Sequence, residues 1–162
     1  MLTFFFAPYF ATVAADYFIA SGMETEVSKA KAQTMWSICL SASGLFIGIS
    51  APILGAIADT SGRRMPWIYV FSVMLILGAL GTWVGVPDGS NLTLMLYFFA
   101  LGYIGTEFAL IFTNAQLTTL GSQSEIGKIS GSGFGFGYLG GVFALAIALL
   151  FLVEQPNGKT FM

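Results

Sequence analysis

The chain has 162 residues, of which 56% are hydrophobic and only 9% are charged, and its mean hydropathy is +0.83. Soluble domains carry about 25% charged residues, so this chain has too few charges to solvate a water-facing exterior. The net charge of −2, without a basic cluster, argues against binding to nucleic acid. With one cysteine, Cys39, and no histidine, a disulfide framework is excluded. We expect no metal site, no cofactor and no enzymatic activity, since histidine is the commonest general base and metal ligand.

Five apolar segments of bilayer length follow one another along the chain. A transmembrane helix needs about 20 predominantly apolar residues, and polar or turn-forming residues separate the segments 2–20, 33–57, 66–86, 92–114 and 129–153. The first segment could also be a secretory signal, but a signal requires a positively charged region before its apolar run, and none precedes it. We therefore predict an all-α, polytopic membrane protein with about five transmembrane helices.

The polar connections give a weak indication of orientation. We expect a loop or an interfacial half-turn at 21–31, a loop at 121–128, and a polar segment at 154–159 that ends the chain in water. The six basic residues divide three against three between the two sides of the membrane, so the positive-inside rule does not decide. The two arginines of the segment 55–64 lie tight against two spans, which favours a cytoplasmic location for that segment.

Glu107 falls inside the fourth span, with apolar neighbours on both sides. A carboxylate near a span centre costs about 2.5–3.5 kcal/mol on insertion scales, so such a residue usually faces a cavity or a partner. Glu107 could carry a proton, pair with a substrate ammonium or form half of an intramembrane pair. Alternatively, it lies close enough to the inner interface to reach water or an arginine. Asp16, only a few residues from a loop, and Asn114, at a helix end where it could simply cap, are weaker candidates for the same role.

Glycines recur in the fifth span at a spacing of four residues. In lipid, small residues let helix backbones approach closely, because helix association there depends on packing. We expect these glycines to serve tight helix packing; the alternative is that they let helices slide and rock, as a gated transporter needs. The candidate packing residues are Gly131, Gly133, Gly137, Gly140 and Gly141.

The polar segment 55–64 joins the second span to the third. Asp59 ends the second span, and Gly62 can take the positive φ that a tight turn needs. Arg63 and Arg64 open the third span, where their stems can extend to the interface. The simpler interpretation is a helical hairpin with an anchoring arginine pair. The functional interpretation is that Asp59 and an arginine make contacts that exist in one conformational state and break in another.

In residue type and spacing this segment resembles the loop between the second and third helices of the major facilitator superfamily. The matching residues are Gly55, Asp59, Gly62, Arg63 and Arg64, and Thr60 departs where a basic residue is usual. The runs 6–10, 113–115 and 130–141 look like the vacuole-effluxer branch of that superfamily, which contains an autophagy-related amino-acid effluxer, and its bacterial relatives.

The resemblance implies a fold of about a dozen helices in two six-helix halves around a central cavity. This chain would form most of the N-terminal half, in a bacterial inner membrane, with the segment 55–64 cytoplasmic. Asp59 would hold a helix N-terminus of the missing C-terminal half and so stabilise the outward-facing state, since a helix N-terminus carries about half a positive charge.

The implied function is secondary active transport of a small solute, with amino acids as the substrate class. The lipid bilayer, the small-molecule substrate and the missing C-terminal half are then the partners of the chain. The alternative is a non-transporting membrane subunit that packs against another polytopic protein.

Overall fold

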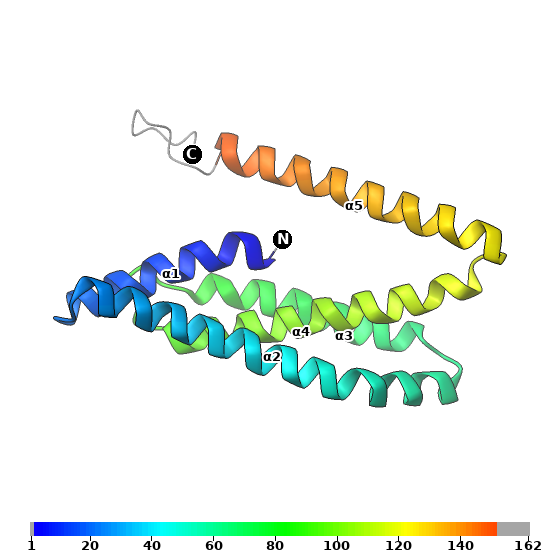
Figure 1. Ribbon diagram of the computed structural model, residues 1–162, viewed down its shortest axis with the longest axis horizontal. Helices are drawn as coiled ribbons and strands as arrows, with labels where there is room; N and C mark the ends of the chain where they lie inside the picture. Colours follow the sequence, from blue (N-terminus) through cyan, green and yellow to red (C-terminus); the bar gives the residue numbers. More distant parts are fainter. Residues whose placement is uncertain (1, 152–162) are drawn as a thin grey trace. The chain divides into compact units, whose positions relative to one another are not determined.

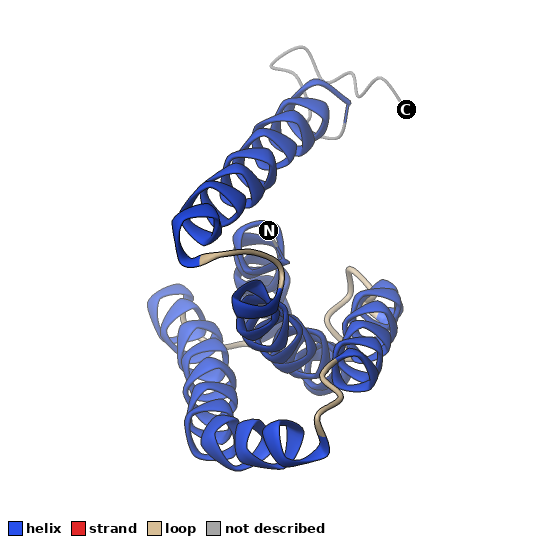
Figure 2. Ribbon diagram, turned by 90° about the vertical axis from the view of Figure 1, so that its right-hand side faces the viewer, coloured by secondary structure: helices blue, strands red, loops and turns tan. Residues whose placement is uncertain are grey.

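The computed structural model describes residues 2–151, and every regular element in that range is a helix (Figures 1 and 2). This confirms the predicted all-α class. The elements are α1 (Leu2–Ala20), α2 (Thr25–Ser61), α3 (Met65–Gly81), η1 (Thr82–Val84), α4 (Leu92–Gln116), η2 (Leu117–Thr119) and α5 (Gln123–Phe151), where η denotes a 3₁₀ turn. The expected end of the last span at 153 and the polar segment 154–159 lie outside the described residues.

Four of the five long helices are long and apolar enough to cross a membrane. These stretches are Thr25–Ser61, Met65–Val84, Leu92–Gln116 and Ser124–Ile147. The helix α1 has 19 residues and is outside this set, so a span at 2–20 stays a prediction. The four helices of membrane-spanning length indicate a polytopic membrane protein.

The polar segment 21–31, expected to be a loop or an interfacial half-turn, is largely helical, and so is the expected loop at 121–128. The helix α2 begins at Thr25, within the polar stretch 21–31. Glu26 and Lys29 lie one turn apart there and form an ion pair of 3.2 Å. For this segment the loop alternative was wrong, because polar composition indicates contact with water, whereas glutamate, lysine and alanine also favour a helix.

The second of these segments, 121–128, contains the start of α5 at Gln123. The backbone N–H and the hydroxyl of Ser122 donate to Oε2 of Glu125 at 3.0 and 2.6 Å. A serine followed three residues later by a glutamate marks a helix N-terminus, because the carboxylate satisfies a backbone N–H that the helix leaves unpaired. This polar stretch therefore starts a helix.

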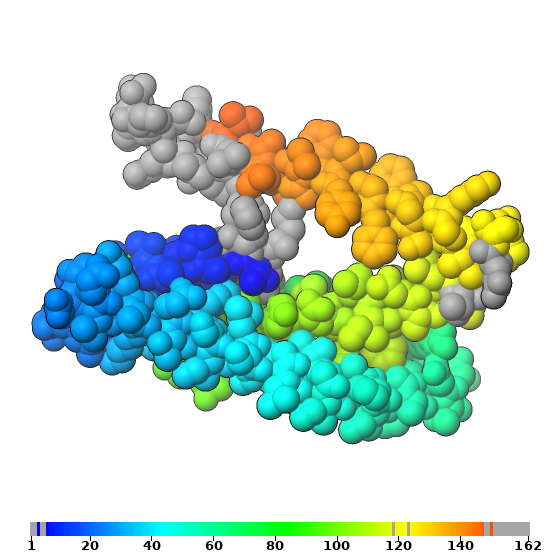
Figure 3. Space-filling model, in the orientation of Figure 1, coloured from blue at the N-terminus to red at the C-terminus, as the bar shows by residue number. Residues whose placement is uncertain are grey.

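The chain divides into two compact units, Met1–Ala115 and Gln116–Met162. In the first unit, α1 to α4 run side by side in alternating directions (Figure 1). The helix α1 packs against the first half of α2, and their blue and cyan surfaces touch in Figure 3. The second unit contains η2 and α5, which contact each other.

Two clusters of buried side chains hold the first unit together, and α4 contributes to both. In the first cluster Trp36 of α2 and Phe99 of α4 lie 4.5 Å apart between ring centroids, with side chains of α1 around them. In the second, Phe71 of α3 stacks on Phe108 and Phe112 of α4 at 4.7 and 5.7 Å. The aromatic rings of α4 thus fix α1, α2 and α3 around it.

Glycines bring α3 and α4 into backbone contact. A Cβ atom added at Gly78 would collide with the backbone of Gly102, and one added at Gly105 would lie 2.7 Å from the backbone nitrogen of Leu75. Small residues allow this approach, which suits association in lipid. By contrast, a Cβ atom at Gly131, Gly133, Gly137 or Gly140 of α5 would meet no described atom within 4 Å, so the packing role of the α5 glycines stays a prediction.

Many large apolar side chains of the first unit are exposed. Ile38, Leu45 and Leu80 expose 63%, 66% and 63% of their surface. Large exposed apolar patches are rare on soluble monomers and mark contact with a membrane or a partner. The exterior therefore agrees with the four helices of membrane-spanning length.

At one end of the unit, the loop between η1 and α4 packs on α1. Gly89 has a φ of +73°, and a Cβ atom there would lie 2.5 Å from Cβ of Tyr17. The backbone N–H of Ser90 donates to Oδ1 of Asp88 at 2.9 Å, and this bond holds the pKa of the exposed Asp88 below its ordinary value. The loop thus has a defined conformation next to the C-terminal end of α1.

Candidate functional site

The segment 55–64 forms a tight turn between two long helices. The helix α2 ends at Ser61, and Gly62 follows with a φ of +63°, its N–H bonded to the carbonyl of Asp59 at 3.3 Å. A left-handed glycine directly after a helix is a common stop, because it lets the chain leave while a free carbonyl is still satisfied. The helix α3 starts three residues later, with Pro66 in its first turn, where its missing N–H costs nothing.

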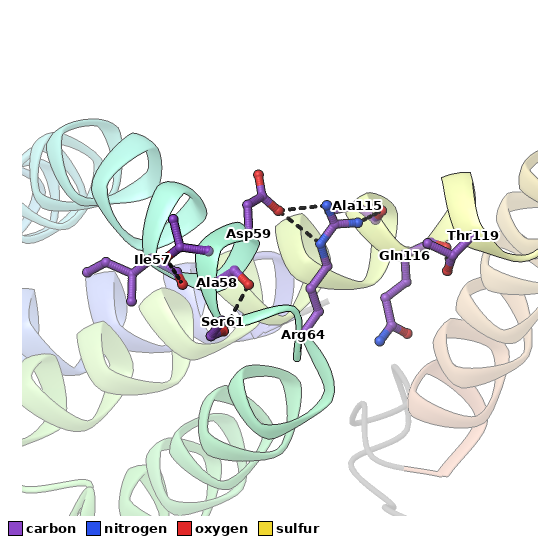
Figure 4. A network of polar contacts seen from close by, with 9 residues as sticks. Ile57, Ala58, Asp59, Ser61, Arg64, Ala115, Gln116 and Thr119 are labelled. Atoms are coloured by element: carbon purple, nitrogen blue, oxygen red, sulfur yellow. Dashed lines mark hydrogen bonds and ion pairs between the residues drawn. The ribbon is translucent and has the colours of Figure 1, made fainter.

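The side chain of Arg64 joins this turn to the C-terminal end of α4 (Figure 4). Its Nε and Nη2 donate to Oδ1 of Asp59 at 3.1 and 2.6 Å, and its Nη1 donates to the carbonyl of Ala115 at 2.5 Å. The planar guanidinium can hold both partners because its donors point in fixed, different directions. Ala115 lies in the last turn of α4, where carbonyls carry partial negative charge that attracts a cation. One side chain therefore connects the ends of α2 and α4 at the start of α3.

The two sides of this bridge differ in exposure. The side chain of Arg64 is 27% exposed, whereas that of Asp59 is 62% exposed. The described residues supply hydrogen bonds to Oδ1 of Asp59 alone. Asp59 can therefore keep Arg64 and still offer its second oxygen to a donor from outside the unit.

The structure does not bring all residues of the predicted motif into the bridge. Gly55 lies one turn before Asp59, and a Cβ atom there would meet no described atom within 4 Å. Arg63 is exposed and forms no hydrogen bond or ion pair with the described residues. The bridge thus consists of Asp59, Arg64 and the backbone of Ala115.

Glu107, Asp16 and Asn114 lie apart from one another. Asp16 is exposed near the end of α1 that packs on the loop at Gly89. Asn114 is exposed at the opposite end of the unit, next to the carbonyl that Arg64 binds. Glu107 is half-buried within α4, about 10 Å along the helix from Asn114. No hydrogen bond or ion pair joins Glu107 to another described residue.

A groove between α2 and α4 was not visible from the sequence. Its volume is about 340 Å³, and it opens on the side of the first unit. Its lining residues are Met35, Ile38, Cys39, Ala42, Ser43, Thr93, Leu96, Tyr97 and Ala100. These residues are mostly apolar, as in any membrane-spanning helix. Their sequence therefore gives no sign that they line a groove.

Comparison with known proteins gives one curated relative. The chain is 26% identical over 143 residues to the uncharacterized MFS-type transporter YxiO of Bacillus subtilis (strain 168). The match covers 87% of this chain and 33% of the relative, so the chain spans about a third of the length of the curated relative. No family model and no solved structure matches the chain. With the four helices of membrane-spanning length, the similarity supports an integral membrane protein related to MFS-type transporters.

Proposed function

We propose that the chain forms most of the N-terminal half of a secondary active transporter, which moves a small solute across a bacterial inner membrane by alternating access. The observation that carries this proposal is the similarity to an MFS-type transporter over 87% of the chain. The match leaves about two thirds of the relative uncovered. That part would supply the sixth helix of the first half, and the C-terminal half that forms the second wall of the cavity. We propose amino acids as the substrate class, on the resemblance of runs such as 137–141 to the vacuole-effluxer branch.

The bridge at the segment 55–64 would act as a conformational latch on the cytoplasmic side. Arg64 holds the junction of α2 and α3 to the end of α4, so these ends would move together. The exposed oxygen of Asp59 would bind a helix N-terminus of the other half in the outward-facing state, where that helix end carries partial positive charge. Opening toward the cytoplasm would break this contact and leave the bridge within the first half intact.

Glu107 would couple solute movement to a proton or to the ammonium of the solute. Its position inside a span of 25 residues, half-buried and without a bonded partner among the described residues, supports this role. An intramembrane carboxylate of this kind is costly, so it usually faces a pathway or a partner.

Transport can be tested with membrane vesicles that contain the protein expressed from its whole gene. The probe is a radiolabelled amino-acid mixture, with a proton gradient across the membrane. We expect accumulation with the wild type, a loss of at least about tenfold with Glu107→Gln, and no change with Glu26→Gln, which removes a carboxylate at the exposed start of α2. Wild-type accumulation by Glu107→Gln would refute the coupling role. No movement of any amino acid by the wild type would refute the substrate class and favour the non-transporting subunit.

A further inference from the structure

The helix α2 is longer than a bilayer requires. Its 37 residues extend over about 54 Å, whereas the hydrocarbon core of a bilayer is about 30 Å thick. Even at a tilt of about 40°, the upper end of the range for membrane helices, a span needs about 26 residues. At least about ten residues of α2 therefore lie outside the hydrocarbon core.

The excess lies at the start of α2, because its neighbours fix the depth of the other end. The helix α3 begins four residues after α2 ends, and its apolar stretch Met65–Val84 has 20 residues, which is about one hydrocarbon thickness. The chain therefore enters the membrane directly after Arg64. The bond from Arg64 to the carbonyl of Ala115 places the end of α4 at the same depth. The Arg64 end of the first unit thus marks one boundary of the hydrocarbon core.

Two exposed aromatic side chains mark the other boundary. Trp83 is 89% exposed and lies about 28 Å from Arg64 along α3 and η1. Tyr97 is 70% exposed and lies about 27 Å from Ala115 along α4. Tryptophan and tyrosine are enriched at the depth of the lipid headgroups, where their rings meet hydrocarbon and water together. The two depths agree with each other and with the thickness of the hydrocarbon core.

The apolar surface of α3 ends at Trp83. One face of the helix carries exposed side chains at a spacing of three or four residues, and Trp83 continues this stripe at its end. The members of the stripe before it are Tyr69, Val73, Ile76 and Leu80. A lipid-facing stripe that ends in a tryptophan is typical of a span that reaches the membrane surface.

The exposed side chains of α2 change character at the same depth. Sγ of Cys39 lies 3.6 Å from the carbonyl oxygen of Leu96, the residue before Tyr97, so α2 crosses the boundary near Cys39. The large exposed side chains after this point are apolar, namely Leu45, Phe46, Ile49, Ile53 and Ile57, and Ile38 directly before it is apolar as well. The larger exposed side chains nearer the start of the helix are mostly polar, namely Glu26, Val27, Lys29, Lys31, Gln33, Thr34 and Ser37. The helix therefore leaves the membrane at Ile38.

The segments that surround the start of α2 lie at its depth. Nζ of Lys31 is 4.2 Å from the ring centroid of Phe18, and the loop between η1 and α4 packs on Tyr17. In Figure 1 the turn between α1 and α2 lies beyond the near ends of α3 and α4. These segments form one body, the cap, which consists of residues 12–37 and 85–91.

The distribution of charge agrees with this boundary. Apart from Glu107, every charged residue in the range 2–115 belongs either to the segment 55–64 or to the cap. The charged residues of the cap are Asp16, Glu24, Glu26, Lys29, Lys31 and Asp88. Charged side chains are costly in hydrocarbon, whereas water solvates them. The cap therefore has the charge content of a water-exposed segment, and the part between the two boundaries does not.

We propose that the membrane boundary crosses the first unit at Trp83 and Ile38, where lipid headgroups contact the ring of Trp83, and that the cap stands in the water beyond it. From Ile38 to its start α2 rises about 20 Å. The headgroup layer takes about 5–7 Å of this, so the cap projects at least about 10 Å into the solvent. Asp16 is then a water-exposed carboxylate outside any intramembrane pathway.

Nitroxide spin labels on single cysteines test the position of this boundary. The protein is expressed from its whole gene, its cysteines, including Cys39, are replaced by alanine, and it is reconstituted in vesicles of phosphatidylethanolamine and phosphatidylglycerol. Labels are attached to Gln33→Cys in the cap and to Ile76→Cys on the stripe of α3. Power saturation measures how often each label collides with oxygen, which concentrates in hydrocarbon, and with a neutral nickel chelate, which is supplied to the water on both sides.

We expect the chelate to collide with the label at position 33 at least about tenfold more often than with the label at position 76, because a polar molecule is excluded from hydrocarbon. Oxygen should show the opposite order. Trp83→Cys should give intermediate rates with both probes. The matched control is Leu45→Cys, on α2 itself and about 10 Å past Ile38, which should be shielded from the chelate as position 76 is.

Three results would overturn the inference. A label at position 33 that meets oxygen in preference to the chelate would show that the start of α2 is embedded in lipid. A label there that meets neither probe would show that protein, and not water, surrounds the cap. Equal access of the chelate to positions 33 and 45 would show that the boundary does not lie between them. None of these results depends on transport, so they leave the proposed function unaffected.

Discussion

Replacing Arg64 by alanine should destabilise the protein more than removing its acidic partner Asp59. The ion pair between them is largely exposed, with side chains 27% and 62% accessible, and such pairs contribute about 0.2–1 kcal/mol. The hydrogen bond from Arg64 to the carbonyl of Ala115 is charge-assisted and part-buried, and bonds of this type contribute about 1.5–3 kcal/mol. We therefore expect a loss of about 2–3 kcal/mol for Arg64→Ala and of at most about 1 kcal/mol for Asp59→Ala.

Tryptophan fluorescence provides the assay. Trp36 and Trp67 pack in the two aromatic clusters of the first unit, so their emission reports the unfolding of the detergent-solubilised protein on heating. For a chain of this size, a loss of 2–3 kcal/mol lowers the Tm by roughly 5–10 °C. Arg63→Ala is the matched control, because this neighbouring arginine is exposed and unbonded among the described residues; its effect should stay within about 0.5 kcal/mol.

Two results would refute this reasoning. Equal destabilisation by Arg64→Ala and Arg63→Ala would mean that the bond to the end of α4 contributes no stability. A loss for Asp59→Ala as large as that for Arg64→Ala would mean that the ion pair, and not the bond to Ala115, is the main interaction.

Three further substitutions test other parts of the structure by the same thermal assay. Gly105→Ala should lower stability by about 1–3 kcal/mol or more, because the added Cβ atom meets the backbone of α3. The control Gly48→Ala, in open space on α2, should leave stability unchanged. Equal effects of the two substitutions would argue against the backbone contact. Gly62→Ala should cost about 1–2 kcal/mol, since its φ of +63° disfavours a side chain; an unchanged Tm would contradict the left-handed turn. Phe108→Ala should cost about 3–5 kcal/mol, because Phe108 is 1% exposed within the second aromatic cluster; a loss below about 1 kcal/mol would show that the cluster is not closely packed.

The helices could largely be predicted from the sequence, because apolar segments of bilayer length in a chain with so few charges leave few other structures. The expected starts at 66 and 92 fall within one residue of Met65 and Leu92. The turn at Gly62 was also predictable, since glycine is the residue that takes a positive φ without strain. Helix starts in polar segments were missed at Thr25 and Gln123, although the spacing of Ser122 and Glu125 is a recognisable start signal.

The contacts between helices were harder to predict from the sequence. Glycine spacing drew attention to α5, whereas the structure shows backbone contact at Gly78, Gly102 and Gly105. Spacing alone does not say which helix face meets a partner. The bond from Arg64 to Ala115 has no sequence signature, because its acceptor is a backbone carbonyl that every residue possesses.

The most direct test of alternating access compares water exposure at the two ends of α4. Tyr97→Cys and Asn114→Cys, each in a protein without Cys39, are labelled with a thiol reagent that does not cross membranes, applied from the side each residue faces, with and without Asp59→Asn. If Asp59 stabilises the outward-facing state, Asp59→Asn should raise labelling at position 114 and lower it at position 97. Unchanged labelling, or a change in the same direction at both positions, would contradict a latch that controls alternating access.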